Sequence, residues 1–185
     1  WFEGQPCYIL HLSNSYELGD EVVMEGCIQT NPVPDLTGYP KEGYARMNAL
    51  LDMHLQETRM HRWRFNLKTG QTHEEDLDDE VTEFPMVNGR YKGRPNRYVY
   101  TAYMVKGFWH LDGLKKYDLQ TGQTQSWHCP PGCYVSEAPF APRIGAKDED
   151  DGYVVTFMND AAHQRAECVI FDAKAIDKGP LCRVA

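Results

Sequence analysis

The sequence lacks the features that mark several large classes of protein. It contains no run of Lys and Arg, and its 185 residues carry a formal net charge of −8. Because phosphate binding requires clustered positive charge, we expect no nucleic-acid partner. The longest apolar stretches have the length of a strand, so no transmembrane segment is expected. A Gly-rich phosphate loop, a Gly-x-Ser-x-Gly elbow and a His-Glu-x-x-His motif are all missing, which leaves nucleotide and serine-hydrolase chemistry without support.

Cysteine is sparse, and its placement bears on the compartment in which the protein folds. The six cysteines are Cys7, Cys27, Cys129, Cys133, Cys168 and Cys182. Most lie in apolar, strand-like contexts, which favours buried free thiols in a reducing compartment over a disulfide framework. We therefore expect a cytoplasmic protein. Cys129 and Cys133 lie beside His128, but their spacing is loose and no second pair follows, so zinc is not favoured.

Short phrases recur along the chain at nearly constant intervals. FNLKTGQT at 65–72 returns as YDLQTGQT at 117–124, and in part as FDAK at 171–174. YVYT at 98–101 returns as YVVT at 153–156. Independent phrases with one period indicate a single structural unit used repeatedly. A period of roughly 50 residues with β-rich phrases is typical of the blades of a β-propeller.

Aligning the repeats divides the chain into about three blades, at 6–68, 81–128 and 135–185. Each blade begins with an apolar inner strand and continues with β-branched and aromatic strands. The first blade carries an insertion at 32–56, and residues 45–55 within it have the apolar spacing of a helix. The predicted fold class is all-β, a partial β-propeller with a short helical insertion.

Two charged segments are interpreted as connections. The acidic run at 74–80 is expected to form a solvated loop between the first two blades. The segment 147–152 lacks the alternating ligands of a calcium loop, so a charged hairpin turn is favoured.

Three polar residues interrupt the apolar inner strands of the predicted blades. His11, Glu83 and Glu137 occupy related places in these strands. A neutral imidazole in an apolar strand is a common ligand of transition metals, but spacing alone favours a core histidine bonded to a backbone carbonyl. The two glutamates could be structural, could orient a metal-bound histidine, or could form an acid/base couple. The other histidines are expected at the surface: His54, His61, His73, His110, His128 and His163.

Further stretches, spread in order over nearly the whole chain, carry a family resemblance. They are HLSNSYE at 11–17, GDEVV at 19–23, RWR at 62–64, EFPMVN at 83–88, KYDL at 116–119, EAPFAPR at 137–143 and EDDGYV at 149–154. As an ordered set they resemble the carotenoid cleavage oxygenase family, which includes the bacterial lignostilbene dioxygenases.

The resemblance implies a seven-bladed propeller with Fe(II) on its axis, bound by histidines from four blades. Glutamates are expected to hydrogen-bond to these histidines and orient them. Iron activates O2, and a C=C bond of an apolar alkene, an apocarotenoid or a stilbene-like compound, is split into two carbonyl products. His11 resembles one iron ligand, Glu83 resembles its glutamate partner, and Glu137 resembles the glutamate that orients another ligand. Peripheral contact with a membrane is compatible with such a substrate.

No other histidine of the chain matches a ligand position of the family. The resemblance therefore implies that residues 1–185 are one partial propeller domain, a piece from the C-terminal side of a longer catalytic domain.

Two other classes of function remain open at this point. A non-catalytic propeller that binds peptides or proteins would show the same periodicity. A propeller glycoside hydrolase could use Glu83 and Glu137 as its carboxylate pair, with no histidine between them. Only the oxygenase gives a reason for Glu83 to meet His11, so the placement of these two side chains separates the hypotheses.

Overall fold

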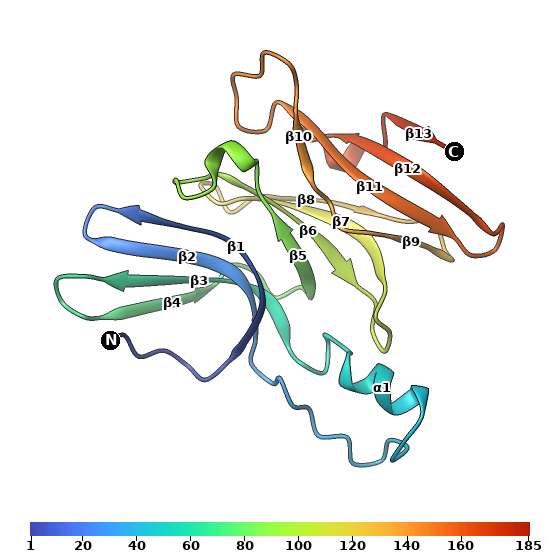
Figure 1. Ribbon diagram of the computed structural model, residues 1–185, viewed down its shortest axis with the longest axis horizontal. Coiled ribbons are helices and arrows are strands. Elements are labelled where there is room, and N and C mark those ends of the chain that lie inside the picture. Colours follow the sequence, from blue (N-terminus) through green and yellow to red (C-terminus); the bar gives the residue numbers. More distant parts are fainter.

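The computed structural model describes residues 1–185 as a fan of antiparallel strands (Figure 1). The first sheet has the order β1-β2-β3-β4, with strands at Tyr8–Leu18, Glu21–Gln29, Thr58–Asn66 and Thr72–Asp76. The second unit contains β5 to β8, at Thr82–Met86, Tyr98–Met104, Leu111–Asp118 and Thr124–His128. The third contains β9 to β13, at Cys133–Val135, Phe140–Pro142, Gly152–Asp160, Arg165–Asp172 and Cys182–Val184.

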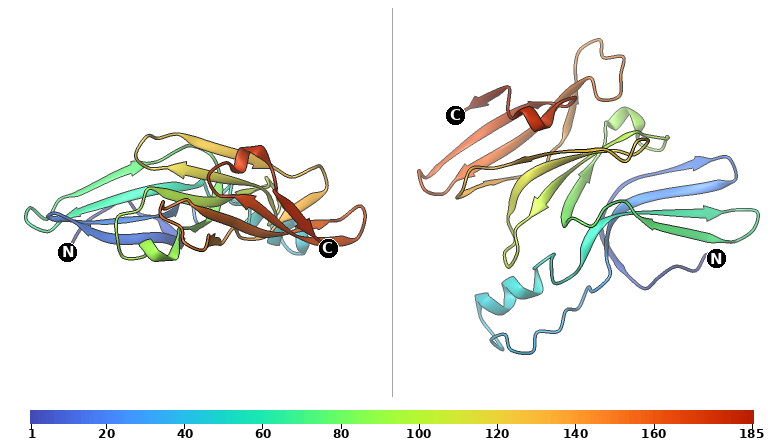
Figure 2. Two further views of the ribbon diagram at one scale, coloured as in Figure 1. Left: turned by 90° about the horizontal axis from the view of Figure 1, so that it is seen from above. Right: turned by 180° about the vertical axis from the view of Figure 1, so that it is seen from behind.

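The first strands of the first two units, β1 and β5, lie beside each other, and both units extend outward from them (Figures 1 and 2). The second and third units join into one sheet, because Val135 of β9 pairs with both Leu111 and Met158. The predicted inner strand over 134–140 is interrupted: β9 and β10 are separated at 136–139, where Pro139 has no N–H to donate. Each of the first two units also has an outermost strand, β4 or β8, beyond the one predicted to be outer.

The recurring phrase marks the same turn in all three units. The side-chain oxygens of Asn66, Asp118 and Asp172 each accept the backbone N–H two residues further along the chain. Gly70 and Gly122 follow in the first two turns, with φ of 73° and 70°. A residue with a Cβ is disfavoured at such angles, so the predicted Thr-Gly hairpin turns are confirmed.

The acidic run at 74–80 is not a solvated loop. Its first half is the edge strand β4, which pairs with the basic strand β3. Asp76 lies 2.6 Å from Nε of Arg59, and Glu75 lies 3.1 Å from a guanidinium nitrogen of Arg62. Opposite charges across adjacent strands stabilise the pairing, and this neighbour cannot be seen in the acidic run itself.

The predicted helical insertion is present but short. The helix α1 spans Tyr44–Leu50, and two 3₁₀ turns, η1 and η2, lie at Gly89–Tyr91 and Ile176–Lys178. Ala49 and Met53 are buried and anchor the insertion. None of these helices has the length and apolar character needed to cross a membrane.

Two apolar clusters hold the units together. The smaller one packs Cys27 and Met60 of the first sheet against Val87, Val99 and Tyr117 of the second unit. The larger one lies between the second and third units and includes residues of β6, β7, β11, β12 and η2. All six cysteines are unpaired.

The expectation that most cysteines are buried is wrong. Cys27 and Cys133 are buried, but Cys7 and Cys182 are exposed. Both exposed cysteines lie near the ends of the chain, where an apolar sequence context does not guarantee a covering layer.

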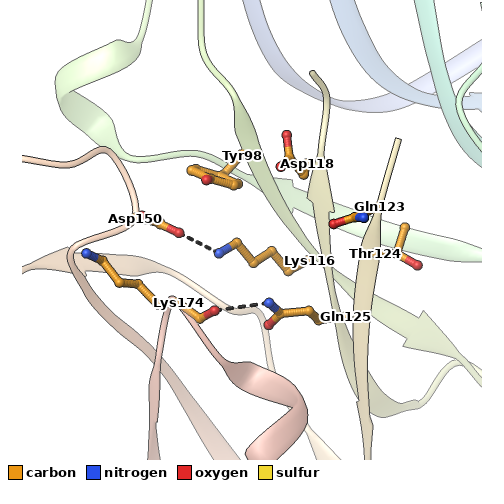
Figure 3. Close-up of a pocket in the computed structure, with 8 residues that line it drawn as sticks. All are labelled: Tyr98, Lys116, Asp118, Gln123, Thr124, Gln125, Asp150 and Lys174. Carbon is orange, nitrogen blue, oxygen red and sulfur yellow. Dashed lines mark hydrogen bonds and ion pairs between the residues drawn. The ribbon is translucent and has the colours of Figure 1, made fainter. Parts of the chain in front are cut away.

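A polar cavity of about 170 Å³ lies at the boundary between the second and third units (Figure 3). Nζ of Lys116 lies 2.7 Å from Asp150 and 4.1 Å from the centre of the Tyr98 ring. The side chains of Lys116 and Asp150 are only 5% and 12% exposed. Gln125 donates a hydrogen bond to the carbonyl oxygen of Lys174 across the same cavity. We call this boundary the seam, and we interpret the buried Lys116–Asp150 ion pair as a contact that stabilises the packing of the two units.

The buried ion pair makes the seam sensitive to the loss of one partner. We expect Asp150→Asn to lower the free energy of unfolding by about 3 kcal/mol, because the Lys116 charge would stay buried without its carboxylate. Urea unfolding measures the change. The matched control is Asp20→Asn, which removes the exposed Lys68–Asp20 pair and should cost less than about 1 kcal/mol. Equal effects of the two substitutions would contradict this interpretation.

The turn after β7 should contribute to acid sensitivity. Arg97 donates two hydrogen bonds to Asp118, at 2.9 and 2.6 Å, and holds the pKa of that carboxyl group well below its usual range. A carboxyl group whose pKa is lowered by folding adds stability above its unfolded pKa of about 4, and this stability is lost as the pH falls further. Asp118→Asn should therefore reduce the loss of unfolding free energy between about pH 7 and pH 3. An unchanged pH dependence in urea unfolding would argue against this contribution.

Candidate functional site

His11 lies where β1 leaves its regular pairing with β2. The register passes from Ile9 opposite Ile28 to Leu12 opposite Gly26, which places His11 in a β-bulge. Gly26 permits the close approach of the two strands, because a Cβ at this position would lie 2.8 Å from the His11 carbonyl oxygen. The imidazole reaches from the first sheet to the second unit.

The partner of His11 in the second unit is Glu83 of β5. Nδ1 of His11 lies 2.8 Å from Oε2 of Glu83. The Glu83 side chain is completely buried, whereas the His11 side chain is 41% exposed. Burial is the largest influence on this carboxyl group and raises the pKa of Glu83, while hydrogen bonds from Phe84 and His11 act in the opposite direction. The predicted meeting of these two side chains is therefore present.

The hydrogen bonds at Glu83 assign the proton of the imidazole. Oε2 accepts the backbone N–H of Phe84 as well as the contact from His11. When Glu83 is ionised its oxygens can only accept, which makes Nδ1 of His11 the donor and leaves the lone pair of the neutral ring on Nε2. A carboxylate behind one ring nitrogen and a free lone pair on the other is the arrangement of a metal-binding histidine.

A cavity of about 210 Å³ opens beside His11. Residues 84–87 of the β5 segment and Leu12 of β1 supply its apolar wall. The Phe84 ring lies 4.8 Å from the His11 ring and 6.1 Å from the Trp109 ring, measured between centroids. Ser13, Lys92 and Glu137 line the rest of the cavity, so an apolar wall faces polar groups that include the potentially metal-binding His11. The apolar wall suits the apolar part of a ligand.

Glu137 lines the same cavity from the connection between β9 and β10. It is exposed, and its carboxylate forms no hydrogen bond or ion pair with His11 or any other residue of the chain. The structure thus places His11 and Glu137 at one cavity, whereas Glu83 lies buried behind it and is bonded to His11. The role of Glu137 in orienting a different histidine stays a prediction.

The expectation of surface positions is wrong for His61. Its side chain is 3% exposed, with Nδ1 2.6 Å from Asp76 and Nε2 3.4 Å from Glu74. The strand β4, interpreted from sequence as a loop, covers it. His54 is also partly buried, with Nε2 2.8 Å from the carbonyl oxygen of Met104. Neither histidine lines the His11 cavity.

No three His, Cys, Asp or Glu side chains are placed together to hold a metal ion. Within this chain, His11 therefore offers a single ligand position. The signal that sequence reasoning missed at the site is the aromatic character of Phe84 and Trp109, which lie 25 positions apart in sequence. Their contact depends on how β5 and the β6–β7 connection pack.

The contact between His11 and Glu83 also bears on the competing functions. A glycoside hydrolase needs two carboxylates that face the substrate, but Glu83 is buried and bonded to an imidazole. A propeller that only binds peptides gives no reason for a completely buried glutamate to face a half-exposed histidine.

Comparison with known proteins adds a family match. The sequence matches the family described as RPE65, retinal pigment epithelial membrane protein, over residues 1–185. A carotenoid 9,10(9',10')-cleavage dioxygenase of Crocus sativus is 35% identical, and the match covers 100% of this chain and 35% of that protein. Lignostilbene-alpha,beta-dioxygenase isozyme III of Sphingomonas paucimobilis is 26% identical, with 99% of this chain and 39% of that protein covered. The chain thus spans little more than a third of the length of these relatives.

Solved structures support the fold. A cobalt-substituted apocarotenoid oxygenase from Synechocystis superposes with a TM-score of 0.86 at 23% identity, covering 99% of this chain and 37% of that one. A chimera of that oxygenase with RPE65 superposes with a TM-score of 0.83 at 22% identity, covering 99% of this chain and 37% of the chimera. The predicted all-β partial propeller is confirmed.

The proton assignment at His11 can be tested without a metal. We expect ¹⁵N NMR of the chain at about pH 8.5, well above the unperturbed histidine pKa of about 6.5, to show the proton of His11 on Nδ1. Glu83→Leu removes the acceptor, so a second population protonated on Nε2 should appear. His163→Gln, in the β11–β12 turn, is the matched control and should leave the His11 signals unchanged. A wild-type His11 protonated mainly on Nε2 would overturn the assignment.

Proposed function

The chain belongs to the retinal pigment epithelial membrane protein family, which includes the carotenoid cleavage oxygenases, and we propose that it forms part of a non-haem Fe(II) oxygenase. The proposed reaction is the oxidative cleavage of a C=C double bond by O2 to give two carbonyl products. The contact of His11 Nδ1 with Glu83 Oε2 carries this proposal. The names of the relatives, carotenoid cleavage and lignostilbene dioxygenases, support the reaction class.

The residues at the cavity and behind it would supply one ligand of such a metal site and the carboxylate that orients this ligand. His11 would bind through Nε2, and Glu83 would hold the ring and raise its basicity through Nδ1. Glu137 would bond to another ligand histidine, supplied from outside these residues. Bound iron would supply Lewis acidity and O2 activation, while the blades supply orientation.

The proposed substrate is an apocarotenoid or a stilbene-like alkene. Leu12, Phe84 and Met86 line the cavity next to His11, where they would bind the apolar alkene and keep water away from it. Both substrate classes are conjugated alkenes, and these contacts favour neither over the other.

A single imidazole should not hold iron tightly. We expect the 185-residue chain by itself to bind Fe(II) weakly and to show no alkene cleavage, because it supplies only His11 to the proposed centre. Anaerobic Fe(II) titration followed by metal analysis after desalting tests this. Tight binding of one iron per chain would contradict the assignment of His11 as one ligand among several.

Full activity should depend on His11 and Glu83 once the remaining blades are present. In the complete protein containing this chain, His11→Ala should abolish O2-dependent formation of carbonyl products. Glu83→Gln and Glu137→Gln should each weaken metal affinity by about 10- to 100-fold, as is usual for residues that orient a ligand histidine. His163→Gln, whose side chain is 72% exposed, is the matched control. Undiminished cleavage by His11→Ala would rule out the proposed role of this residue.

A further inference from the structure

Phe84 has a backbone conformation that is unusual for a bulky residue inside a strand. Its φ is +56°, in the left-handed region. The other non-glycine residues with positive φ are Glu57 and Gln164, and both lie in turns. A positive φ is energetically unfavourable for an aromatic residue because its Cβ is crowded by the backbone. Such conformations persist where the surrounding structure enforces them, often at functional sites.

The peptide plane between Glu83 and Phe84 is turned so that the Phe84 N–H faces the Glu83 carboxylate. Turning a planar peptide changes ψ of the residue before it and φ of the residue after it together, so the positive φ of Phe84 and the direction of its N–H are linked. The register of β5 against β6 breaks between Glu83 and Met86. Within this break the Phe84 N–H turns back and donates to Oε2 of Glu83. A regular strand would direct this N–H toward a neighbouring strand or solvent, and the carboxylate would then have one donor fewer.

The same carboxylate oxygen is the atom that meets His11. Oε2 receives both the Phe84 N–H and Nδ1 of His11, whereas Oε1 is buried without a partner. The position of the Glu83 carboxylate therefore depends on two donors to a single oxygen. Losing the backbone donor would free the carboxylate to rotate about its side-chain torsions and to leave Nδ1.

The ring of Phe84 is a separate contact. It lies against the His11 ring with an interplanar angle of 35° and meets the Trp109 ring nearly edge-on, at 77°. The residue thus touches the pair in two ways, through its N–H on the carboxylate and through its ring on the imidazole. Substitutions that separate backbone from ring can tell these contributions apart.

We propose that Phe84 is a positioning residue for the His11–Glu83 pair, and that its left-handed backbone, more than its ring, keeps Glu83 on Nδ1 of His11. The consequence is an imidazole whose Nε2 stays available to the cavity. The inference rests on the proposed function only where Nε2 is taken as the metal-binding atom. Phe84 itself contacts no reacting atom in this role.

The test compares substitutions that differ in their tolerance of positive φ. Phe84→Gly and Phe84→Asn remove the ring but accept the left-handed conformation, whereas Phe84→Val removes the ring and strongly disfavours it. We expect the Gly and Asn variants to keep the His11 proton on Nδ1 in ¹⁵N NMR of the full chain. The Val variant should show a mixture of both tautomers. If the Val variant does not fold, Phe84→Ala provides a milder version of the same strain.

A second measurement follows metal affinity in the complete protein, with Co²⁺ as a spectroscopic probe. Phe84→Val should weaken Co²⁺ binding by about tenfold, the lower end of what is lost when a ligand histidine loses its support. Phe84→Gly should bind Co²⁺ more tightly than Phe84→Val, although both lack the ring.

Phe157 provides the matched control for general effects on folding. It lies in β11 within a regular stretch of pairing to β12, so Val should be tolerated better than Gly there. Thermal unfolding should show the opposite order at position 84, with Gly tolerated better than Val. The same order at both positions would overturn the proposal.

The outcomes separate this inference from the proposed function. If Gly and Val at position 84 disturb the His11 tautomer equally, the ring is responsible and the backbone role is wrong. If His11→Ala and Glu83→Gln leave Co²⁺ binding unchanged, the proposed metal site fails, and the NMR comparison alone then decides the role of Phe84. If those two variants lose Co²⁺ while Phe84→Val keeps both tautomer and affinity, the metal site stands and the role of Phe84 is refuted.

Discussion

The hydrogen bond between His11 and Glu83 joins two sheets through residues that lie 72 positions apart. A completely buried carboxylate is unfavourable unless it has donors, and this one has two on the same oxygen. Both strands depart from regular pairing to supply these donors, β1 at His11 and β5 after Glu83. Two of the register shifts of the fold thus lie where the candidate site is built, while another lies between β6 and β7 at Tyr103 and Met104.

The relative placement of β1 and β5 depends on directional contacts between the units. Apolar packing holds neighbouring units together but does not specify their angle, whereas hydrogen bonds do. The amide of Asn14 bonds to the loop at 91–96, which leads into β6. Glu149 accepts the backbone N–H groups of Arg97 and Tyr98. These hydrogen bonds connect the third unit to the start of β6 in the second unit. These polar contacts preserve the geometry that His11 and Glu83 require.

The presence of a single candidate ligand, His11, bears on how the proposed metal centre would be completed. The proposed metal centre would need further ligands from outside these residues, because the three units described here supply only His11 to the cavity. This explains how a chain that spans little more than a third of its relatives can have a well-formed His11–Glu83 pair and yet no cluster of metal-binding side chains. Rigid sheets, not flexible loops, would then fix the positions of the ligands.

Local chemistry in the sequence determined the repeat, the hairpin turns and the candidate pair. Alternating apolar strands, Asx and Thr-Gly turns, and polar residues inside apolar strands are all visible within a few neighbouring positions. Tertiary structure alone decided which charged side chains are paired. The first part of the acidic run forms β4 against the basic side chains of β3, and His61 is buried beneath it. Tertiary structure also decided that the predicted strand at Glu137 is interrupted. It also decided the left-handed conformation of Phe84, which local preference opposes. These features depend on residues that are distant in sequence, and pairing across sheets is settled only when the sheets pack.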